Sequence, residues 1–176
     1  DGGGDICIGH VRYSPGGMSE RENSQPLVMR YAKGTIAIAN NGSLVNTHAL
    51  REPLEKQGAI FQTDSDAELI ALLIARARLE AGSVEQAINR AMNQIEGAYS
   101  FVLMSPRKMI AVRDPQGFRP LCIGKMEDSY IFASETCALD SLGAEFVRDI
   151  EPGEIVVADE NGIRSIRDHC GHKSSL

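Results

Sequence analysis

The stretch at residues 65–97, SDAELIALLIARARLEAGSVEQAINRAMNQIEG, decides the fold class. It contains two helix starts of the same kind, because Ser65 is followed three residues later by Glu68 and Ser83 by Gln86. In this capping-box pattern the serine caps the helix and the acid or amide returns the hydrogen bond, so Glu68 is expected to be the partner of Ser65. Apolar residues then recur at helical spacing, at 69, 70, 73 and 77 and again at 87, 88, 91 and 95. Two amphipathic helices are predicted, the second running to Gly97.

Short apolar segments on both sides of this pair predict strands. Those before the pair are 6–13, 26–31 and 35–39, followed by a helix at 46–57. Those after it are 99–104, 109–113, 121–123, 130–133, 154–158 and 163–167, with a short helix at 137–142. Strands, then paired helices, then strands again predict an α/β domain of the α+β kind, with helices stacked on largely antiparallel sheets.

Composition limits the classes of function. The chain has 176 residues, of which 43% are hydrophobic and 24% charged, as in one globular domain of about 150 residues. A net charge of −6 with no basic block argues against a nucleic-acid partner, and no apolar run is long enough to cross a membrane. Four widely spaced cysteines predict reduced thiols in the cytoplasm rather than a disulfide framework.

Three places carry residues suited to binding or catalysis. Arg12 ends an apolar segment before a long polar loop, and its planar fork suits a carboxylate, although a surface ion pair also explains it. Asn41-Gly42 is a strong turn signal, yet a helix follows it, so the amide and the glycine N–H also suit an oxyanion hole. Asp66 stands at a helix start, where it either complements the helix dipole or holds a ligand ammonium group.

Six segments together resemble one enzyme family, and the resemblance covers nearly the whole chain. They are IGHVRYS at 8–14, NSQP at 23–26, NGSLVN at 41–46, TDSD at 63–66, RDPQGFRPL at 113–121 and ASETCALD at 133–140. The earlier segments are similar to class II glutamine amidotransferases in general, and the last two resemble the glutaminase domain of the amidophosphoribosyltransferases. The resemblance implies an N-terminal-nucleophile hydrolase, a four-layer αββα sandwich, here incomplete at its N-terminus.

The resemblance also implies a reaction and a role for each candidate residue. The family hydrolyses the side-chain amide of glutamine and passes ammonia to phosphoribosyl pyrophosphate, forming 5-phosphoribosylamine in the first step of purine synthesis. By motif, Arg12 would bind the α-carboxylate of glutamine and Asp66 its α-ammonium group. Asn41 and Gly42 would form the oxyanion hole.

The chain departs from the family pattern at its start. The family nucleophile is an N-terminal cysteine whose α-amino group acts as base, whereas residue 1 here is Asp1. We therefore expect residues 1–176 to be part of a glutaminase domain, inactive alone, with the phosphoribosyltransferase domain lying outside it. Two further departures, Pro15-Gly16 after the Arg-Tyr-Ser segment and Asn40 before Asn41, affect the expected affinity for glutamine.

Cofactors and partners follow from the resemblance alone. No cofactor is expected in this chain. Mg²⁺ would serve the phosphoribosyltransferase domain, some relatives carry a 4Fe–4S cluster, and a full-length homo-oligomer, dimer or tetramer, is expected. The alternatives are a non-catalytic glutamine-binding module of the same fold and another class II amidotransferase.

Overall fold

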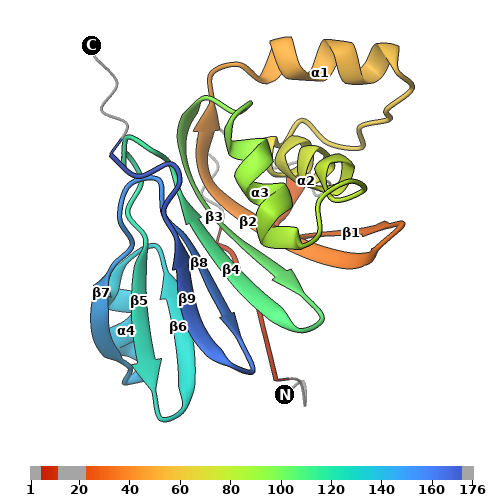
Figure 1. Ribbon diagram of the computed structural model, residues 1–176. Coiled ribbons are helices and arrows are strands. Elements are labelled where there is room, and N and C mark those ends of the chain that lie inside the picture. Colours follow the sequence, from red (N-terminus) through yellow and green to blue (C-terminus); the bar gives the residue numbers. More distant parts are fainter. Residues whose placement is uncertain (1–4, 12–22, 172–176) are drawn as a thin grey trace.

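The nine strands of the described chain form two antiparallel sheets (Figure 1). The computed structural model describes residues 5–11 and 23–171. Sheet A has six strands in the order β1-β2-β3-β4-β8-β9, and sheet B has three in the order β6-β5-β7. In chain order the elements are β1 (Leu27–Tyr31), β2 (Gly34–Leu44), α1 (Thr47–Lys56), α2 (Asp66–Ala77), α3 (Val84–Met92), β3 (Gly97–Ser105), β4 (Lys108–Arg113), β5 (Cys122–Met126), β6 (Ser129–Ala133), α4 (Thr136–Leu142), β7 (Glu145–Asp149), β8 (Ile155–Asp159) and β9 (Gly162–Ile166).

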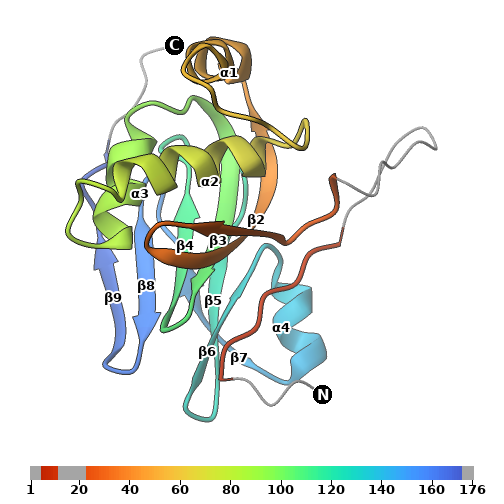
Figure 2. The same ribbon diagram turned by 90° about the vertical axis from the view of Figure 1, so that its right-hand side faces the viewer.

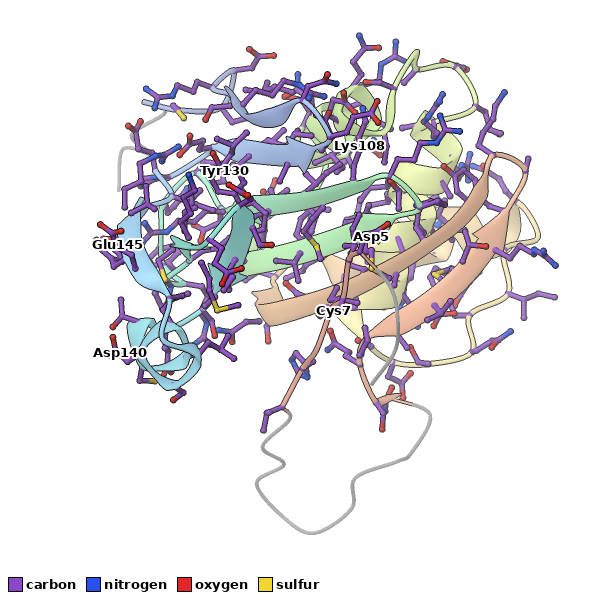
Figure 3. The ribbon with its side chains drawn as sticks, turned by 90° about the horizontal axis from the view of Figure 1, so that it is seen from below. Asp5, Cys7, Lys108, Tyr130, Asp140 and Glu145 are labelled. Carbon is purple, nitrogen blue, oxygen red and sulfur yellow. The ribbon has the colours of Figure 1, made fainter. Side chains whose placement is uncertain are left out.

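The two sheets lie between two helical layers, which confirms the predicted four-layer αββα sandwich (Figures 1 and 2). Helices α2 and α3 cover one face of sheet A, and α4 covers the outer face of sheet B (Figure 2). Seen from below, Asp140 of α4 and Glu145 of β7 mark this outer layer, well away from Lys108 of β4 (Figure 3).

Alternation along the strands explains the layers, because successive side chains point to opposite faces of a sheet. In β4, Ile110 and Val112 pack with the helices of sheet A, whereas Ala111 packs between the sheets with Ile123 and Ile150. A third and smaller cluster, under α4, contains Cys122, Leu139 and Ala144. All of these side chains are at most 9% exposed, so three separate apolar interfaces hold the four layers together.

Sheet B interrupts sheet A in sequence, because β5, β6, α4 and β7 lie between the paired strands β4 and β8. The excursion begins and ends at one point, where the Ile150 N–H donates to the Leu121 carbonyl at 2.9 Å. Beside that point the Arg113 N–H donates to the Glu154 carbonyl at 3.2 Å. Sheet B is therefore joined to the rest of the chain through a narrow neck.

A buried ion pair also links the two sheets. Glu154, fully buried just before β8, accepts hydrogen bonds from both terminal nitrogens of Arg148 on β7, at 2.8 and 2.7 Å. The Ser165 hydroxyl of β9 and the Glu151 N–H donate to the same carboxylate. Burial alone would raise the pKa of Glu154, but the hydrogen bonds from Arg148, Ser165 and Glu151 lower it to about 2.

Several predicted elements differ from the structure. Residues 6–11 form no strand and join neither sheet, so the expected strand at 6–13 is wrong for its described part; Asp5 and Cys7 mark this segment in Figure 3. Strand β2 continues to Leu44, beyond the expected end at residue 39, and α3 ends at Met92, before the expected end at Gly97. Strand β7 was not predicted. Within the described residues no helix is long and apolar enough to cross a membrane.

Candidate functional site

Three of the six sequence segments, 23–26, 41–46 and 63–66, meet at the end of β2. The Asp64 N–H donates to Oδ1 of Asn23 at 3.2 Å, and the Leu44 N–H donates to Oδ2 of Asp66 at 2.9 Å. These two hydrogen bonds hold the end of β2 and the segment before β1 against the start of α2. Arg12, the fourth residue expected here, lies outside the described residues.

Asn41 and Gly42 lie inside β2 rather than in a hairpin turn. They pair with Ser100 and Tyr99 of β3 in an unbroken register. The helix expected after this segment is present, because α1 begins at Thr47. The turn interpretation of Asn-Gly is therefore wrong, and the pair occupies the last part of a strand that leads into a helix.

Gly42 is required by backbone geometry. Its φ is +130°, a value that residues other than glycine rarely adopt. A Cβ at this position would lie 2.0 Å from the carbonyl oxygen of Ala98 on β3. The two strands approach so closely only because residue 42 has no side chain.

The amide of Gly42 faces the open edge of sheet A. Alternate N–H groups of a strand point to the same edge. On the β1 side, the Asn40 N–H donates to Oε1 of Gln25 at 2.6 Å, and the Leu44 N–H to Asp66. The Gly42 N–H lies between these two, and no acceptor for it on that side occurs among the described residues. Within the described residues it is an available hydrogen-bond donor, whereas the N–H groups of Asn40 and Leu44 on either side of it have acceptors.

The Asn41 side chain lies on the opposite face of β2 from Ile36 and Ile38, which pack against the helices. It is half-buried and forms no hydrogen bond within the part of the chain that the structure describes. Next to it in the ladder, the Ser100 hydroxyl donates to the Pro120 carbonyl at 3.3 Å. The Asn41 amide therefore faces the space on the sheet B side, beside the loop that joins β4 to β5.

Asp66 occupies the first turn of α2 and connects three elements. One carboxylate oxygen accepts from the Leu44 N–H and the other from the Thr47 hydroxyl at 2.8 Å. An ionised carboxylate has about four lone-pair positions, so two remain for a ligand. The structure brings Asp66 to within two residues of Gly42 along β2.

The cap of α2 differs from the predicted capping box. Ser65 does cap the helix, accepting from the Ala67 N–H at 3.2 Å. Glu68, which was expected to return a hydrogen bond to Ser65, instead accepts from the N–H groups of Gln62 and Thr63 and from the Thr63 hydroxyl. The Ser65 N–H donates to the Thr63 hydroxyl oxygen. The predicted Ser65–Glu68 reciprocity is wrong because the preceding loop supplies better donors to the buried Glu68 carboxylate.

Sequence reasoning assigned no role to Asn23 and Gln25, although they stand in one of the quoted segments. Both use a side-chain amide oxygen to accept a backbone N–H far away in sequence. The only signal was two amides within the three residues before Pro26, at the end of a long polar loop. That signal indicates polarity and does not identify the partners.

The segments at 113–121 and 133–140 meet at a different place, around a hollow of about 410 Å³. The hollow is lined by Pro120, Leu121, Cys122, Ser134, Glu135, Thr136, Cys137 and Asp149. Arg113 braces the loop by donating to three carbonyls, those of Gly117, Arg119 and Ile150. Asp114, fully buried, accepts the Gln116 N–H at 2.9 Å. The loop is thus held by its own first two residues.

Tyr99, opposite Gly42 on β3, is fully buried. Burial, and secondly the charge of Asp114, raises the pKa of its hydroxyl well above the ordinary value. The phenol therefore stays neutral at physiological pH, and it adds no charge beside the two proposed donors. Among the described residues, the Gly42 N–H and the Asn41 amide lack a hydrogen-bond partner, and each is a donor suited to a carbonyl oxygen that gains negative charge; the Asp66 carboxylate is suited to a cation.

Comparison with known proteins identifies relatives of this arrangement. The family model described as a glutamine amidotransferase domain matches residues 10–141. An amidophosphoribosyltransferase of Methanocaldococcus jannaschii is 49% identical over 162 residues, which are 92% of this chain and 34% of that protein. The Bacillus subtilis glutamine phosphoribosylpyrophosphate amidotransferase, solved with ADP and GMP, superposes with a TM-score of 0.82 at 44% identity, covering 90% of this chain and 34% of that one.

A second solved structure, described as the allosteric regulatory enzyme of purine biosynthesis, gives a TM-score of 0.84 at 45% identity over the same shares of the two chains. The chain spans about a third of the length of these relatives.

Proposed function

The chain belongs to the glutamine amidotransferase domain family, and from this premise we propose that it is the glutamine-hydrolysing part of an amidophosphoribosyltransferase. The whole enzyme would transfer ammonia from glutamine to phosphoribosyl pyrophosphate and form 5-phosphoribosylamine, which opens purine synthesis. The observation that carries the proposal is the open edge of β2, where the Gly42 N–H and the Asp66 carboxylate lie two residues apart.

Each site residue has a chemical task in this proposal. The guanidinium fork of Arg12 binds the α-carboxylate of glutamine, and the Asp66 carboxylate binds its α-ammonium group. The Gly42 N–H and the Asn41 amide donate to the side-chain carbonyl oxygen of glutamine. When a nucleophile adds to that carbonyl, the oxygen becomes negative and these two hydrogen bonds strengthen, which lowers the barrier to loss of ammonia.

The nucleophile itself is proposed to be an N-terminal cysteine that precedes Asp1 in the natural protein. An α-amino group with a pKa of about 8 is a suitable base at neutral pH. Mass-spectrometric mapping of the N-terminus of the natural protein tests this directly. A free cysteine several dozen residues before Asp1 is the expected result, and a natural start at Asp1 would contradict the proposed hydrolysis.

The remaining parts of the proposal concern the whole enzyme. Phosphoribosyl pyrophosphate, Mg²⁺ and a homo-oligomeric, cytoplasmic enzyme are proposed from the family alone. Within the described residues, 5–11 and 23–171, no three His, Cys, Asp or Glu side chains gather into a group that could hold a metal ion.

Glutamine binding by residues 1–176 tests the recognition half of the site. Calorimetric titration with L-glutamine should give saturable binding and no ammonia release, because residues 1–176 do not include the cysteine proposed as the nucleophile. Asp66→Asn keeps the size and an acceptor oxygen but removes the charge that faces the ligand ammonium group. We expect its affinity for glutamine to fall by about tenfold or more, as for a lost charge-assisted hydrogen bond.

A matched control lies on α4, away from the site. Asp140 is exposed there, so Asp140→Asn changes the net charge equally and should leave the affinity for glutamine unchanged. Equal affinities of Asp66→Asn and the parent chain would contradict the role proposed for Asp66.

A further inference from the structure

Strand β1 stops one step before the pairing that its register would next require. The β1–β2 ladder pairs Tyr31 with Gly34 and ends by pairing Leu27 with Ile38. The next residues to share a ladder bond, two further along each strand, are Gln25 and Asn40. Pro26 has no N–H, and the main chain of Gln25 does not continue the strand. The edge of β2 would therefore lose its main-chain partner at Asn40.

The Gln25 side chain replaces that partner. Its Oε1 accepts the Asn40 N–H at 2.6 Å, where a strand carbonyl would otherwise lie. Asn40 is 5% exposed, so water could not easily take over this role. The Asn40 side chain in turn donates from Nδ2 to the Gly42 carbonyl at 3.3 Å. A chain of two hydrogen bonds thus runs from Gln25 through Asn40 to Gly42.

On the far side of Gly42, the Leu44 N–H is held by Asp66. Among the described residues, the Gly42 N–H therefore has no acceptor, and it lies between two amides that are fixed by side chains, Gln25 before it and Asp66 after it. The direction of a hydrogen-bond donor matters in an oxyanion hole, because its contribution decreases steeply as its distance and angle to the oxygen depart from the optimum.

We propose that Gln25 is the positioning residue of the oxyanion hole: its amide oxygen substitutes for a strand carbonyl and fixes the backbone that aims the Gly42 N–H at the glutamine carbonyl. The inference rests on the proposed function, since it assumes that glutamine is the ligand. Gln25 need not touch glutamine in this role, so it acts through Asn40.

The test compares glutamine affinity across a small set of variants. Gln25→Leu removes the acceptor at similar size, Gln25→Asn keeps an amide that is too short to reach, and Gln25→Glu keeps an acceptor oxygen at the same reach. The control is Gln86→Leu, because Gln86 also accepts a backbone N–H, that of Gly82 at 3.0 Å, but on α3 and away from β2.

We expect the dissociation constant for L-glutamine to rise about tenfold in Gln25→Leu and in Gln25→Asn, and to stay near the parent value in Gln25→Glu and in Gln86→Leu. Amide exchange measured by NMR should show faster exchange of the Asn40 N–H in the first two variants only. The Gly42 amide signal should shift when the parent chain binds glutamine, and it should shift less in those same variants.

Each possible result either supports or overturns the role proposed for Gln25. If Gln25→Leu does not fold, the comparison of Gln25→Asn with Gln25→Glu carries the test alone. Unchanged affinity in Gln25→Asn, with faster Asn40 exchange, would give Gln25 a structural role only and overturn the inference while leaving the proposed function intact. Absence of glutamine binding by the parent chain would overturn the proposed function and this inference with it.

Discussion

Gly42 lies where β2 passes closest to β3, with the position of a Cβ only 2.0 Å from the Ala98 carbonyl oxygen. The residue has two separate requirements, a positive φ and an absent side chain. Both serve the same end, because the turned backbone leaves the N–H of residue 42 at the open edge of the sheet. Gly34, at the start of β2, shares only the first requirement: its φ is +126°, and nothing lies within 4 Å of its Cβ position.

This pair of glycines gives a residue-scale prediction. Gly34→Ala should lower the free energy of unfolding by about 1–2 kcal/mol, from backbone strain alone. Gly42→Ala should lower it by about 2 kcal/mol more, because the methyl group must displace the β3 backbone. Urea denaturation of both variants measures the difference, and equal losses would refute the close approach of the strands.

At this scale the sequence singled out candidate residues but did not predict their contacts. Asn41-Gly42 was a candidate because a helix follows it, and Asp66 because it stands at a helix start. The roles of Asn23 and Gln25 could not be predicted, since their partners are 41 and 15 residues away and depend on tertiary packing. Glu68 was assigned wrongly for the same reason: Gln62 and Thr63 supply donors that the local pattern does not contain.

At the scale of elements, the loop between β4 and β5 has a shape fixed by Arg113 and Asp114. The Arg113 guanidinium satisfies three carbonyls at 2.7–2.9 Å, and the buried Asp114 carboxylate satisfies N–H groups of the same loop. Phe118, 68% exposed, stands out from this rigid loop. The loop lies beside Asn41 through the contact of Ser100 with Pro120, so its shape bounds one side of the candidate site.

Arg113→Lys is the matching prediction. An ammonium group is a single point donor and cannot span the three carbonyls that the planar fork reaches, so two of them lose their partner. We expect the free energy of unfolding to fall by about 1–3 kcal/mol. Arg107→Lys, in the exposed turn before β4, is the control and should change it by less than about 0.5 kcal/mol. A loss no larger than that of the control would show that the loop does not depend on the fork.

Helices were predicted more accurately than strands. The starts of α2 and α3 follow from a serine cap and apolar spacing of 3–4 residues, and the structure has both caps. β7 was missed because three of its five residues are charged and four are exposed, as is common at a sheet edge. β2 was predicted too short because Asn40 to Ser43 are polar, although they pair with β3. Backbone pairing with β3, rather than the burial of apolar side chains, keeps those residues in the strand.

At the scale of the whole molecule, the Glu154–Arg148 pair joins sheet B to sheet A. Its carboxylate has a pKa of about 2 in the folded chain and an ordinary value of 4.5. Because the folded pKa is the lower one, the pair stabilises the fold fully above pH 4.5, and the stabilisation is lost as the pH falls toward 2. This loss amounts to about 3 kcal/mol.

Glu154→Gln should therefore flatten the acid limb of the stability curve. Urea denaturation between pH 7 and pH 3 should show the parent chain losing stability below pH 4.5, while the variant is less stable at pH 7 and changes less on acidification. Glu160→Gln, in the exposed turn between β8 and β9, should behave as the parent chain does. An identical acid limb in the two variants would contradict the role of the pair.

The narrow neck between Leu121 and Ile150 has a kinetic consequence. Strands β4 and β8 can pair only when the two ends of the sheet B segment between them lie together. The contact that joins these ends, between Leu121 and Ile150, is long-range in sequence. Closing a flexible loop of this size has an entropic cost of about 3 kcal/mol, which must be met before the ladder bonds of β8 form. Folding speed decreases as such non-local contacts accumulate. The residues at the neck, Arg113 among them, are thus placed to set the rate at which the chain folds.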